Sequence, residues 1–263
     1  MYIVPLIGKG TPLTLVGLDA ACDRAGVSAQ HLWAVIFVET DFPNCGYLRD
    51  RRPQILYEPR CFSNLTDHAY DETNADISSA VYHQDHGSFN DQYLFLAKAC
   101  ALDQDKALQS CSWGIGQTLG RNYQEAGFAD VTSFVLSMVN AEDGQASAMA
   151  GEMVESGAAK ALAKEDWVKF AKIYNGPGFA SNQYDRKVKR QFDLLKDKLP
   201  DLRVRTAQCC LWYEGFDPGQ MDGLWGKTTV GAWHRYQASH QIPVTDALDD
   251  HTFQMLVKPY ISA

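Results

Sequence analysis

Apolar side chains recur at helical spacing through most of the first 199 residues. Residues 13–25 predict a helix that Gly26 ends, because glycine readily adopts the left-handed conformation that terminates a helix. Ser28 is a favourable N-cap for a second helix, whose apolar positions run on to Glu39. The same periodicity predicts further helices over residues 91–102, 130–139, 165–174 and 182–199. On the 91–102 helix we expect the buried positions to be Tyr93, Leu94, Leu96, Ala97 and Cys100.

The helical pattern breaks between residues 41 and 62. Pro43, Gly46 and Pro53 interrupt it, and the short apolar run 55–57 follows. Such a run between turn residues favours a strand over a helix. We therefore expect a small β-hairpin, inserted directly after a helix that ends in the carboxylate Glu39.

The chain changes character after residue 198. Residues 199–201 read as a linker, and helices are expected over residues 204–213, 228–240 and 249–257. We therefore predict two domains, residues 1–198 and residues 199–263. The core of the smaller domain is expected to consist of Leu211, Trp212, Leu224, Trp225, Trp233 and Leu256.

Composition excludes several classes of protein. Of 263 residues, 46% are hydrophobic and 21% charged, which excludes a globally disordered chain. The 24 Lys and Arg against 32 Asp and Glu give a net charge of −8, so non-specific nucleic-acid binding and a polybasic membrane anchor are not expected. No apolar run approaches the ~20 residues that span a bilayer, and no secretory signal is recognised. The seven cysteines include no C-x-x-C pair, so we expect reduced, mostly buried thiols.

Glu39 is the first candidate for chemistry. It follows the apolar run 34–38, whose side chains would shield its carboxyl from water. Burial disfavours the ionised form of a carboxyl and raises its pKa, as a general acid near neutral pH requires. The alternative is a solvated carboxylate at a helix end.

Two later segments strengthen the case for Glu39. Residues 112–117, Ser-Trp-Gly-Ile-Gly-Gln, place two glycines and an amide beside an aromatic ring, which suits a close approach of the backbone to a sugar. Tyr174 and Asn175 close a later helix. Together with Glu39, this order of segments resembles the lysozyme superfamily, including goose-type lysozymes and lytic transglycosylases.

Four ordered motifs narrow the resemblance. Residues 52–58, 110–114, 120–123 and 174–177 are similar to those of the phage-type N-acetylmuramidase family, over residues 12–195. The chain departs from the family at residues 59–61, Pro-Arg-Cys, where a basic residue or histidine is frequent. The resemblance implies a mainly α, lysozyme-like domain with a small β-hairpin insertion. It also implies cleavage of the β-1,4 bond between N-acetylmuramic acid and N-acetylglucosamine by a glycoside hydrolase, a lysozyme.

Such a reaction needs an acid and usually a second carboxylate. Glu39 takes the acid role, and Glu58 is the preferred second group, with Asp50 and Asp41 as competitors. Glu58 has an alternative role as the ion-pair partner of Arg51, Arg52 or Arg60. If no second carboxylate lies close, the reaction would be that of a lytic transglycosylase, which uses one glutamate and forms a 1,6-anhydro product.

Other residues are expected to contact substrate or to serve the fold. Ser112, Gln117, Tyr174 and Asn175 are predicted substrate contacts, with packing and loop geometry as the alternative. Tyr123 is predicted to be a core residue rather than a platform for a sugar. Residues 83–86, His-Gln-Asp-His, read as a polar surface loop, because a third metal ligand at helical spacing is missing. We expect no metal and no cofactor.

The C-terminal 63 residues carry a second resemblance. Residues 221–229, Met-Asp-Gly-Leu-Trp-Gly-Lys-Thr-Thr, are similar to the core of the three-helix peptidoglycan-binding domain. Asp222 and Trp225 are the candidate wall-binding residues, and the alternative is that this motif only builds the fold. Asp222 and Gly223 suit a tight turn.

Together these resemblances predict a modular phage endolysin. Its partner would be bacterial peptidoglycan, bound by a monomer without membrane insertion or nucleic acid. It would be made in the host cytoplasm without a signal peptide and reach the wall in the periplasm after release through a holin. The alternatives are an antibacterial muramidase toxin or an autolysin, and a wall-binding protein without activity.

Overall fold

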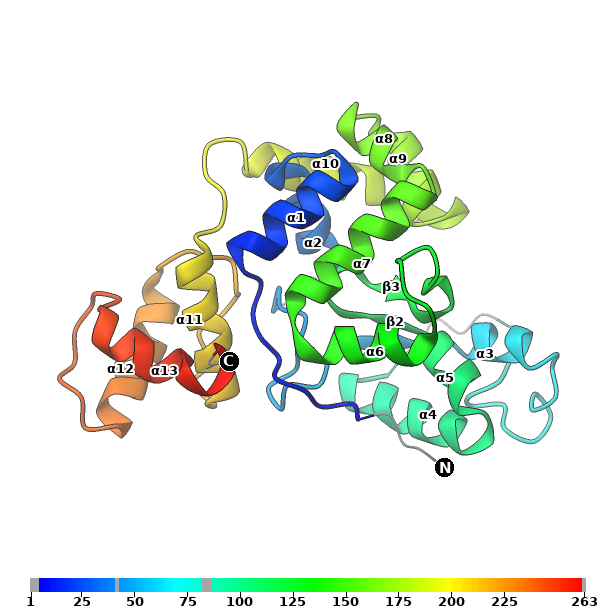
Figure 1. Ribbon diagram of the computed structural model, residues 1–263, viewed down its shortest axis with the longest axis horizontal. Helices are drawn as coiled ribbons and strands as arrows, with labels where there is room; N and C mark the ends of the chain where they lie inside the picture. The colour runs from blue at the N-terminus through cyan, green and yellow to red at the C-terminus, as the bar shows by residue number, and fades with distance from the viewer. Residues whose placement is uncertain (1–4, 41–42, 82–86, 262–263) are drawn as a thin grey trace.

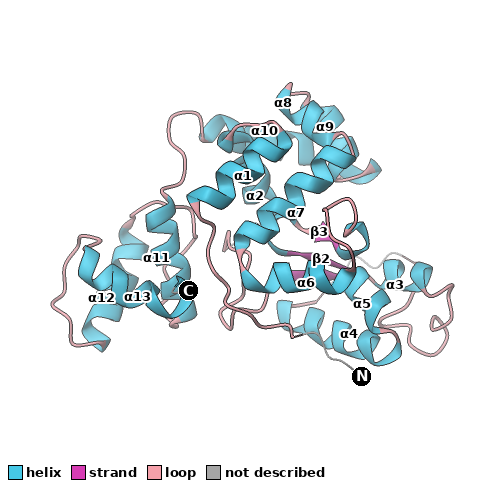
Figure 2. Cartoon of the chain, viewed as in Figure 1, coloured by secondary structure: helices cyan, strands magenta, loops and turns pink. Residues whose placement is uncertain are grey.

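The computed structural model describes residues 5–40, 43–81 and 87–261. This part of the chain is mainly helical (Figure 2). The helices up to residue 199 are α1 (Leu15–Ala25), α2 (Ala29–Glu39), α3 (Pro59–Leu65), α4 (Phe89–Leu102), α5 (Gln104–Gln109), α6 (Val131–Asn140), α7 (Glu142–Glu155), α8 (Ala158–Ala163), α9 (Trp167–Tyr174) and α10 (Tyr184–Leu194). They are followed by α11 (Leu202–Tyr213), α12 (Lys227–Ser239) and α13 (Asp250–Ile261). No helix in these ranges has both the length and the apolar character needed to cross a membrane.

The strand predicted at residues 55–57 forms, but its partner is remote in sequence. β1 (Ile55–Tyr57) pairs antiparallel with β2 (Cys111–Trp113), which pairs with β3 (Thr118–Leu119). The expectation of a hairpin within residues 41–62 is therefore wrong in its pairing. The local element there is a single bridge between Tyr47 and Pro53. Side chains of β1 and β2 alternate, so Ile55, Tyr57, Cys111 and Trp113 enter the core.

Local signals explain where the helices begin and end. Thr14 accepts a hydrogen bond from the backbone of Gly17 to start α1, and Gly26, at φ 65°, ends it. Ser28 and His31 form a capping box at the start of α2. α10 ends at Leu194, five residues before the predicted end, because the chain turns there toward Pro200 and α11.

α7 is a central helix that the sequence pattern does not predict. Its segment is rich in alanine and glycine, and its apolar stripe consists only of Ala146, Met149, Ala150 and Met153, which are fully buried. Small side chains let α1 pack closely along it, and both helices belong to the same core cluster. The expectation for α4 fails at two positions: Leu94 is 60% exposed and Ala97 is exposed as well.

The last three helices enclose a core of their own, to one side of the remaining fold (Figure 1). Leu211, Trp233 and Leu256 are buried in it, as predicted, and Trp225 is partly buried. Leu224, in contrast, is 46% exposed. Trp212 instead packs on Cys45 and Tyr47 of the first part of the chain.

A buried interface, which we call the seam, joins the C-terminal helices to the rest of the protein. Arg205 of α11 and Glu142 of α7 form a two-pronged ion pair, at side-chain exposures of 1% and 0%. The N-terminal segment runs between the two parts (Figure 1), where the Tyr213 hydroxyl donates to the carbonyl of Gly10 at 3.0 Å. The Thr11 hydroxyl donates to the carbonyl of Tyr260, also at 3.0 Å.

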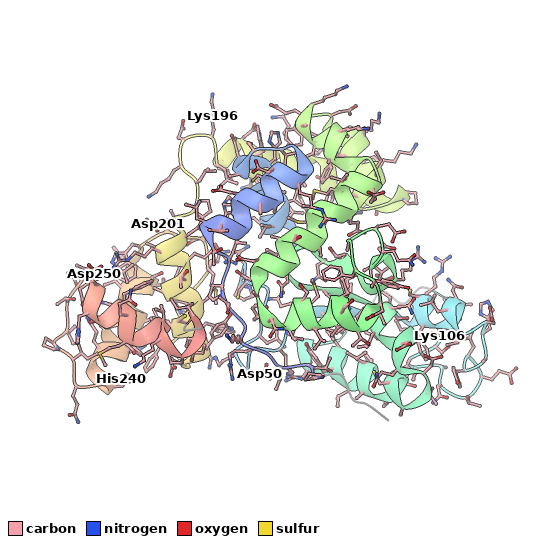
Figure 3. All side chains as sticks on the ribbon, viewed as in Figure 1. Asp50, Lys106, Lys196, Asp201, His240 and Asp250 are labelled. Carbon is pink, nitrogen blue, oxygen red and sulfur yellow. The ribbon has the colours of Figure 1, made fainter. Side chains whose placement is uncertain are left out.

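The predicted linker is therefore short and leads directly into the seam. The chain enters α11 at Asp201, whose carboxylate caps that helix (Figure 3). Cys45 and Cys209 meet in the same interface, with their sulfur atoms 3.7 Å apart, and all seven cysteines are free thiols. The division at residue 198 remains a prediction about domains, but the two parts are in firm contact.

Candidate functional site

Glu39 is the last residue of the apolar helix α2. Residues 32–36 before it are buried. At the end of the helix, the amide and the hydroxyl of Thr40 both donate hydrogen bonds to the carbonyl of Ile36. The Glu39 side chain keeps partial exposure. α2 thus holds one carboxyl at the boundary between the core and solvent.

The environment of Glu39 favours its protonated form. Burial raises its pKa to about 7 from the usual range. A hydrogen bond donated by the Tyr184 hydroxyl to Oε1 works in the opposite direction, and the negative charge of Glu152 raises the pKa further. The shift predicted from the sequence is therefore present. A carboxyl with this pKa can hold a proton near neutral pH and release it to a leaving group.

Tyr174 connects the helix that carries it to the turn at residues 114–117. Its hydroxyl donates to the carbonyl of Gly116 at 2.8 Å, and its ring stacks on Phe170 with centroids 5.3 Å apart. Gln117 adopts a left-handed conformation, φ 46°, and its amide donates to the carbonyl of Gly114 at 2.9 Å. The charge of Glu39 also acts on Tyr174, so Glu39, Tyr174 and this turn belong to one region of the fold.

The glycines of the turn are required by packing. A Cβ on Gly114 would lie 2.3 Å from Cδ of Gln145, and one on Gly116 would lie 2.5 Å from Cβ of Met149. Both obstacles belong to α7, and Oε1 of Gln145 also accepts from the backbone of Ile115 at 2.9 Å. Close packing on α7 thus accounts for both glycines, and the expected close approach of the backbone to a sugar stays a prediction.

Glu152 of α7 and Tyr184 of α10 are members of the site that sequence reasoning missed. Asn122, the last residue of the 3₁₀ helix η2 (Gly120–Asn122), donates to Oε1 of Glu152 at 2.7 Å. Burial raises the pKa of Glu152, and the bond from Asn122 opposes that shift. Tyr184 is buried beside Glu39. Burial, and next the negative charge of Glu39, raise the pKa of Tyr184 well above its usual value.

Glu58, the predicted second carboxylate, lies at the far end of the short sheet. The backbone amide of Glu58 donates to the carbonyl of Ser110, just before β2 begins. The turn at residues 114–117, which Tyr174 contacts, lies just after β2 ends. Glu58 is the N-cap residue of α3, and its charge acts on the thiols of Cys61 and Cys111. Its assignment as the second carboxylate stays an untested prediction.

Of the two competing carboxylates, Asp50 is the one that the structure describes. Asp50 is paired with Arg52, at 2.7 Å between Nε and Oδ2, on the surface. Asp41 lies outside the described residues, as do the two histidines of the segment 83–86. Within the described ranges, no group of three or more metal-binding side chains gathers.

The remaining candidates take up varied positions. Ser112 is nearly buried on β2, between Leu56 and Leu119 and on the face opposite the core residues of the sheet. Asn175 is exposed at the C-cap of α9. Tyr123 packs against the buried cluster that contains Tyr57 and Trp113, which agrees with the expected core role. Their contacts with substrate stay predictions.

The wall-binding candidates are both engaged within the C-terminal helices. Oδ1 of Asp222 accepts from Gln208 at 3.1 Å and from the backbone of Leu224 at 2.9 Å. The Trp225 indole donates to the carbonyl of Asp246 at 2.7 Å and packs edge-on against Trp233. These contacts show that both residues build the local fold, and a role in binding stays a prediction.

Comparison with known proteins identifies the family of this site. A family model described as N-acetylmuramidase matches residues 28–196, more than half of the chain. The crystal structure of the Burkholderia AP3 phage endolysin is similar, with 31% identity and a TM-score of 0.63. The match covers 71% of this chain and 72% of the other. No curated protein sequence matches.

Proposed function

Because the chain belongs to the N-acetylmuramidase family, we propose that it cleaves the β-1,4 bond between N-acetylmuramic acid and N-acetylglucosamine in peptidoglycan by hydrolysis. A member of this family is a glycoside hydrolase of the bacterial cell wall. The geometry around Glu39 supports the finer statement about the reaction. This residue ends an apolar helix, and burial raises its pKa to about 7, so that its carboxyl can hold a proton near neutral pH.

Glu39 acts in this proposal as the general acid. Breaking the glycosidic bond leaves negative charge on the departing oxygen, and a proton delivered in the transition state lowers that barrier. Tyr184 fixes the carboxyl through its hydrogen bond to Oε1. Tyr174 holds the turn at residues 114–117 against the same site through Gly116. Tyr184 thus positions the acid, and Tyr174 positions the turn.

The C-terminal helices form the wall-binding part in the same proposal. They have a core of their own, which supports a separate module, and the seam fixes that module to the catalytic part. A second binding surface on one polymer raises the effective concentration of the enzyme at its substrate. We expect the inactive full-length Glu39→Gln protein to co-sediment with purified cell walls, and loss of this binding on removal of residues 200–263.

The proposed biological role is lysis of the host by a phage endolysin, acting on peptidoglycan in the periplasm after release through a holin. The similar solved structure is that of a phage endolysin, which supports this role. A secreted antibacterial muramidase or an autolysin would perform the same chemistry. A neighbouring holin gene would favour the endolysin, and a neighbouring immunity gene the toxin.

Mass spectrometry of digested peptidoglycan tests the reaction. After borohydride reduction, hydrolysis by a muramidase leaves reduced N-acetylmuramic acid at the new chain ends. N-acetylglucosamine at those ends would contradict the proposed bond. A 1,6-anhydro end would show the reaction of a lytic transglycosylase instead of hydrolysis. Digestion by the Glu39→Gln protein is the matched control.

A further inference from the structure

Cys45 and Cys209 lie on opposite sides of the seam, and their thiols are in contact. Cys45 belongs to the segment between α2 and α3, and Cys209 belongs to α11. Their sulfur atoms are 3.7 Å apart, and both residues are fully buried. The two cysteines are 164 positions apart in the chain, so this contact joins the C-terminal helices directly to the rest of the protein.

Hydrogen bonds on both sides of Cys45 hold it against α11. The carbonyl of Asn44 accepts from Nη2 of Arg205 at 2.9 Å. The backbone amide of Gly46 donates to Oε1 of Glu142 at 2.7 Å. The residues before and after Cys45 are therefore bonded to the two members of the buried ion pair, and the position of Cys45 is set by the seam.

α11 places Cys209 on the same face as Arg205, because residues four positions apart lie one above the other on a helix. Arg205 bonds to the segment that carries Cys45, and Cys209 contacts the same segment one turn further along. Met221 is buried in the same cluster as the two cysteines, and its backbone amide donates to the carbonyl of Pro43 at 2.9 Å. Contacts from both parts of the chain thus surround the two thiols.

Cys210 is the neighbour that could compete for Cys209. Adjacent residues of an α-helix do not face each other. Accordingly, Cys210 packs in the core of the C-terminal helices, whereas Cys209 packs with Cys45 in the seam. The fold therefore pairs Cys209 with Cys45 rather than with its neighbour in sequence.

We propose that Cys45 and Cys209 are a disulfide site, which links the C-terminal helices covalently to the catalytic part after the protein leaves a reducing compartment. The compartments in this statement rest on the proposed function, because an endolysin is made in the reducing cytoplasm and acts in the oxidising periplasm. The co-reactant is a disulfide oxidant.

The bond forms by thiol–disulfide exchange. One cysteine thiolate attacks the disulfide of the oxidant, which gives a mixed disulfide and releases one thiol of the oxidant. The other cysteine thiolate attacks the mixed disulfide, which forms the bond between Cys45 and Cys209 and releases the second thiol. Two electrons pass to the oxidant, and the two cysteine protons end on its thiols.

Burial controls the rate of this reaction. Both thiols are fully buried, so an oxidant reaches them only when the seam opens. Burial also raises the pKa of Cys209 well above its usual value, which disfavours the reactive thiolate in the closed seam. A concentration of urea that leaves the protein folded should therefore accelerate the oxidation.

The first test treats the wild-type protein with oxidised glutathione in such a concentration of urea. Free thiols are then alkylated, and the digested protein is mapped by mass spectrometry. We expect a cross-linked pair of peptides that contains Cys45 and Cys209 and is separated by reduction. Free or glutathionylated Cys209, or a bond between Cys209 and Cys210, would overturn the proposal. This test needs no variant, so a variant that fails to fold does not remove it.

Cys209→Ala and Cys210→Ala are the matched variants, because both residues are fully buried and no Lys or Arg separates them for tryptic mapping. We expect Cys209→Ala and Cys45→Ala to lose the cross-link and Cys210→Ala to keep it. A cross-link that persists in Cys209→Ala would overturn the assignment.

Oxidation should also raise the midpoint of urea unfolding of the wild type by on the order of 1 M, since a cross-link that closes a long loop lowers the entropy of the unfolded chain. The reduced protein is the reference, and Cys45→Ala should show no such rise. An unchanged midpoint in cross-linked wild-type protein would overturn the proposed link between the two parts.

The last test follows the Glu39→Gln protein in cells with and without a co-expressed holin, with thiols alkylated before the cells are opened. We expect free Cys45 and Cys209 in the cytoplasm and the cross-link after release, and free thiols after release would overturn the proposal. If the wild type releases N-acetylmuramic acid ends while these thiols resist oxidation, only this inference fails. If the cross-link forms but those ends are not released, the proposed function fails.

Discussion

The Tyr184 hydroxyl, on α10, donates a hydrogen bond to Oε1 of Glu39 at the end of α2. The two helices pack against each other, and the ring of Tyr184 is buried beside that of Phe170. The bond opposes the rise in the Glu39 pKa that burial produces. Tyr184 therefore tunes the acid as well as orienting it.

Replacing Glu39 by Gln should abolish lysis without unfolding the protein. Glutamine keeps the size and polarity of the side chain but cannot deliver a proton, so the rate should fall by about 100- to 10,000-fold. Release of soluble fragments from purified walls measures the rate, and circular dichroism checks the fold. Near-wild-type release would contradict the role of Glu39 as the acid.

The rate should fall as the pH rises through about 7. Glu39 must be protonated to act, and burial raises its pKa to about 7. Above that pH the rate should drop about tenfold for each pH unit, since the protonated fraction does so. Soluble glycans are the right substrate for this profile because the charge of the cell wall also changes with pH. A rate that stays constant to pH 9 would show that another group supplies the proton.

The same pKa shift should make the wild type less stable than Glu39→Gln at high pH. The folded protein binds this proton more tightly than the unfolded chain, whose carboxyl has an ordinary pKa near 4.5. Its stabilising contribution is complete below about pH 4.5 and is lost as the pH rises to about 7. The difference in unfolding free energy should therefore shift in favour of the glutamine variant by on the order of 3 kcal/mol. Urea titrations at pH 4.5 and 8 measure it, and an equal difference at both pH values would refute the shift.

Replacing Tyr184 by Phe should lower the rate and move its alkaline limb to higher pH. A hydrogen bond to an ionised group contributes about 1.5–3 kcal/mol, so its loss should disfavour the ionised form of Glu39. The less well oriented acid should act about 10-fold or more slowly. Tyr174→Phe is the comparison, because the Tyr174 hydroxyl bonds to Gly116 rather than to Glu39. An alkaline limb that moves equally in both variants would speak against a specific effect of Tyr184.

Replacing Arg205 by Met should destabilise the whole protein by about 3–5 kcal/mol, because Glu142 would remain charged and buried. Burial opposes ionisation of Glu142, and Arg205 outweighs it to lower the pKa. The double variant Glu142→Gln/Arg205→Met should recover part of this loss. Arg203→Met is the matched control on the same helix. This variant removes an exposed ion pair with Asp250 and should lower the free energy of unfolding by at most about 1 kcal/mol. Urea titrations measure the free energy of unfolding of each variant. Equal losses in the two single variants would contradict the importance of the seam.

Local sequence signals were sufficient for Glu39 but not for the rest of its site. The Ser28 cap and the apolar run fix α2 and hence the position of its last residue. Glu152 lies on α7, whose apolar stripe consists of two alanines and two methionines and was not recognised as a helix in the sequence. Tyr184 begins a charge-rich helix and gives no sign of the carboxyl that it meets.

Local sequence patterns also do not show which distant segments pair with each other. The short apolar run Ile55–Tyr57 between turn residues indicates a strand but not that its partner is β2. Arg205 stands in a helix that was predicted correctly, yet one arginine in a partly polar helix reads as a surface residue. Its burial depends on Glu142, which lies on the helix that was missed.

The Arg205–Glu142 pair also constrains how this chain can be recombined with others. A chimera that joins residues 199–263 to a foreign catalytic part imports an arginine whose charge needs an acid at the start of the helix corresponding to α7. It also needs the acceptor that Asn44 supplies, because Nη2 of Arg205 donates to that carbonyl at 2.9 Å. Without both, the chimera would bury an arginine without its partners in the seam. Recipients can thus be screened first by the acid at the position of Glu142 in a sequence comparison, before any protein is made.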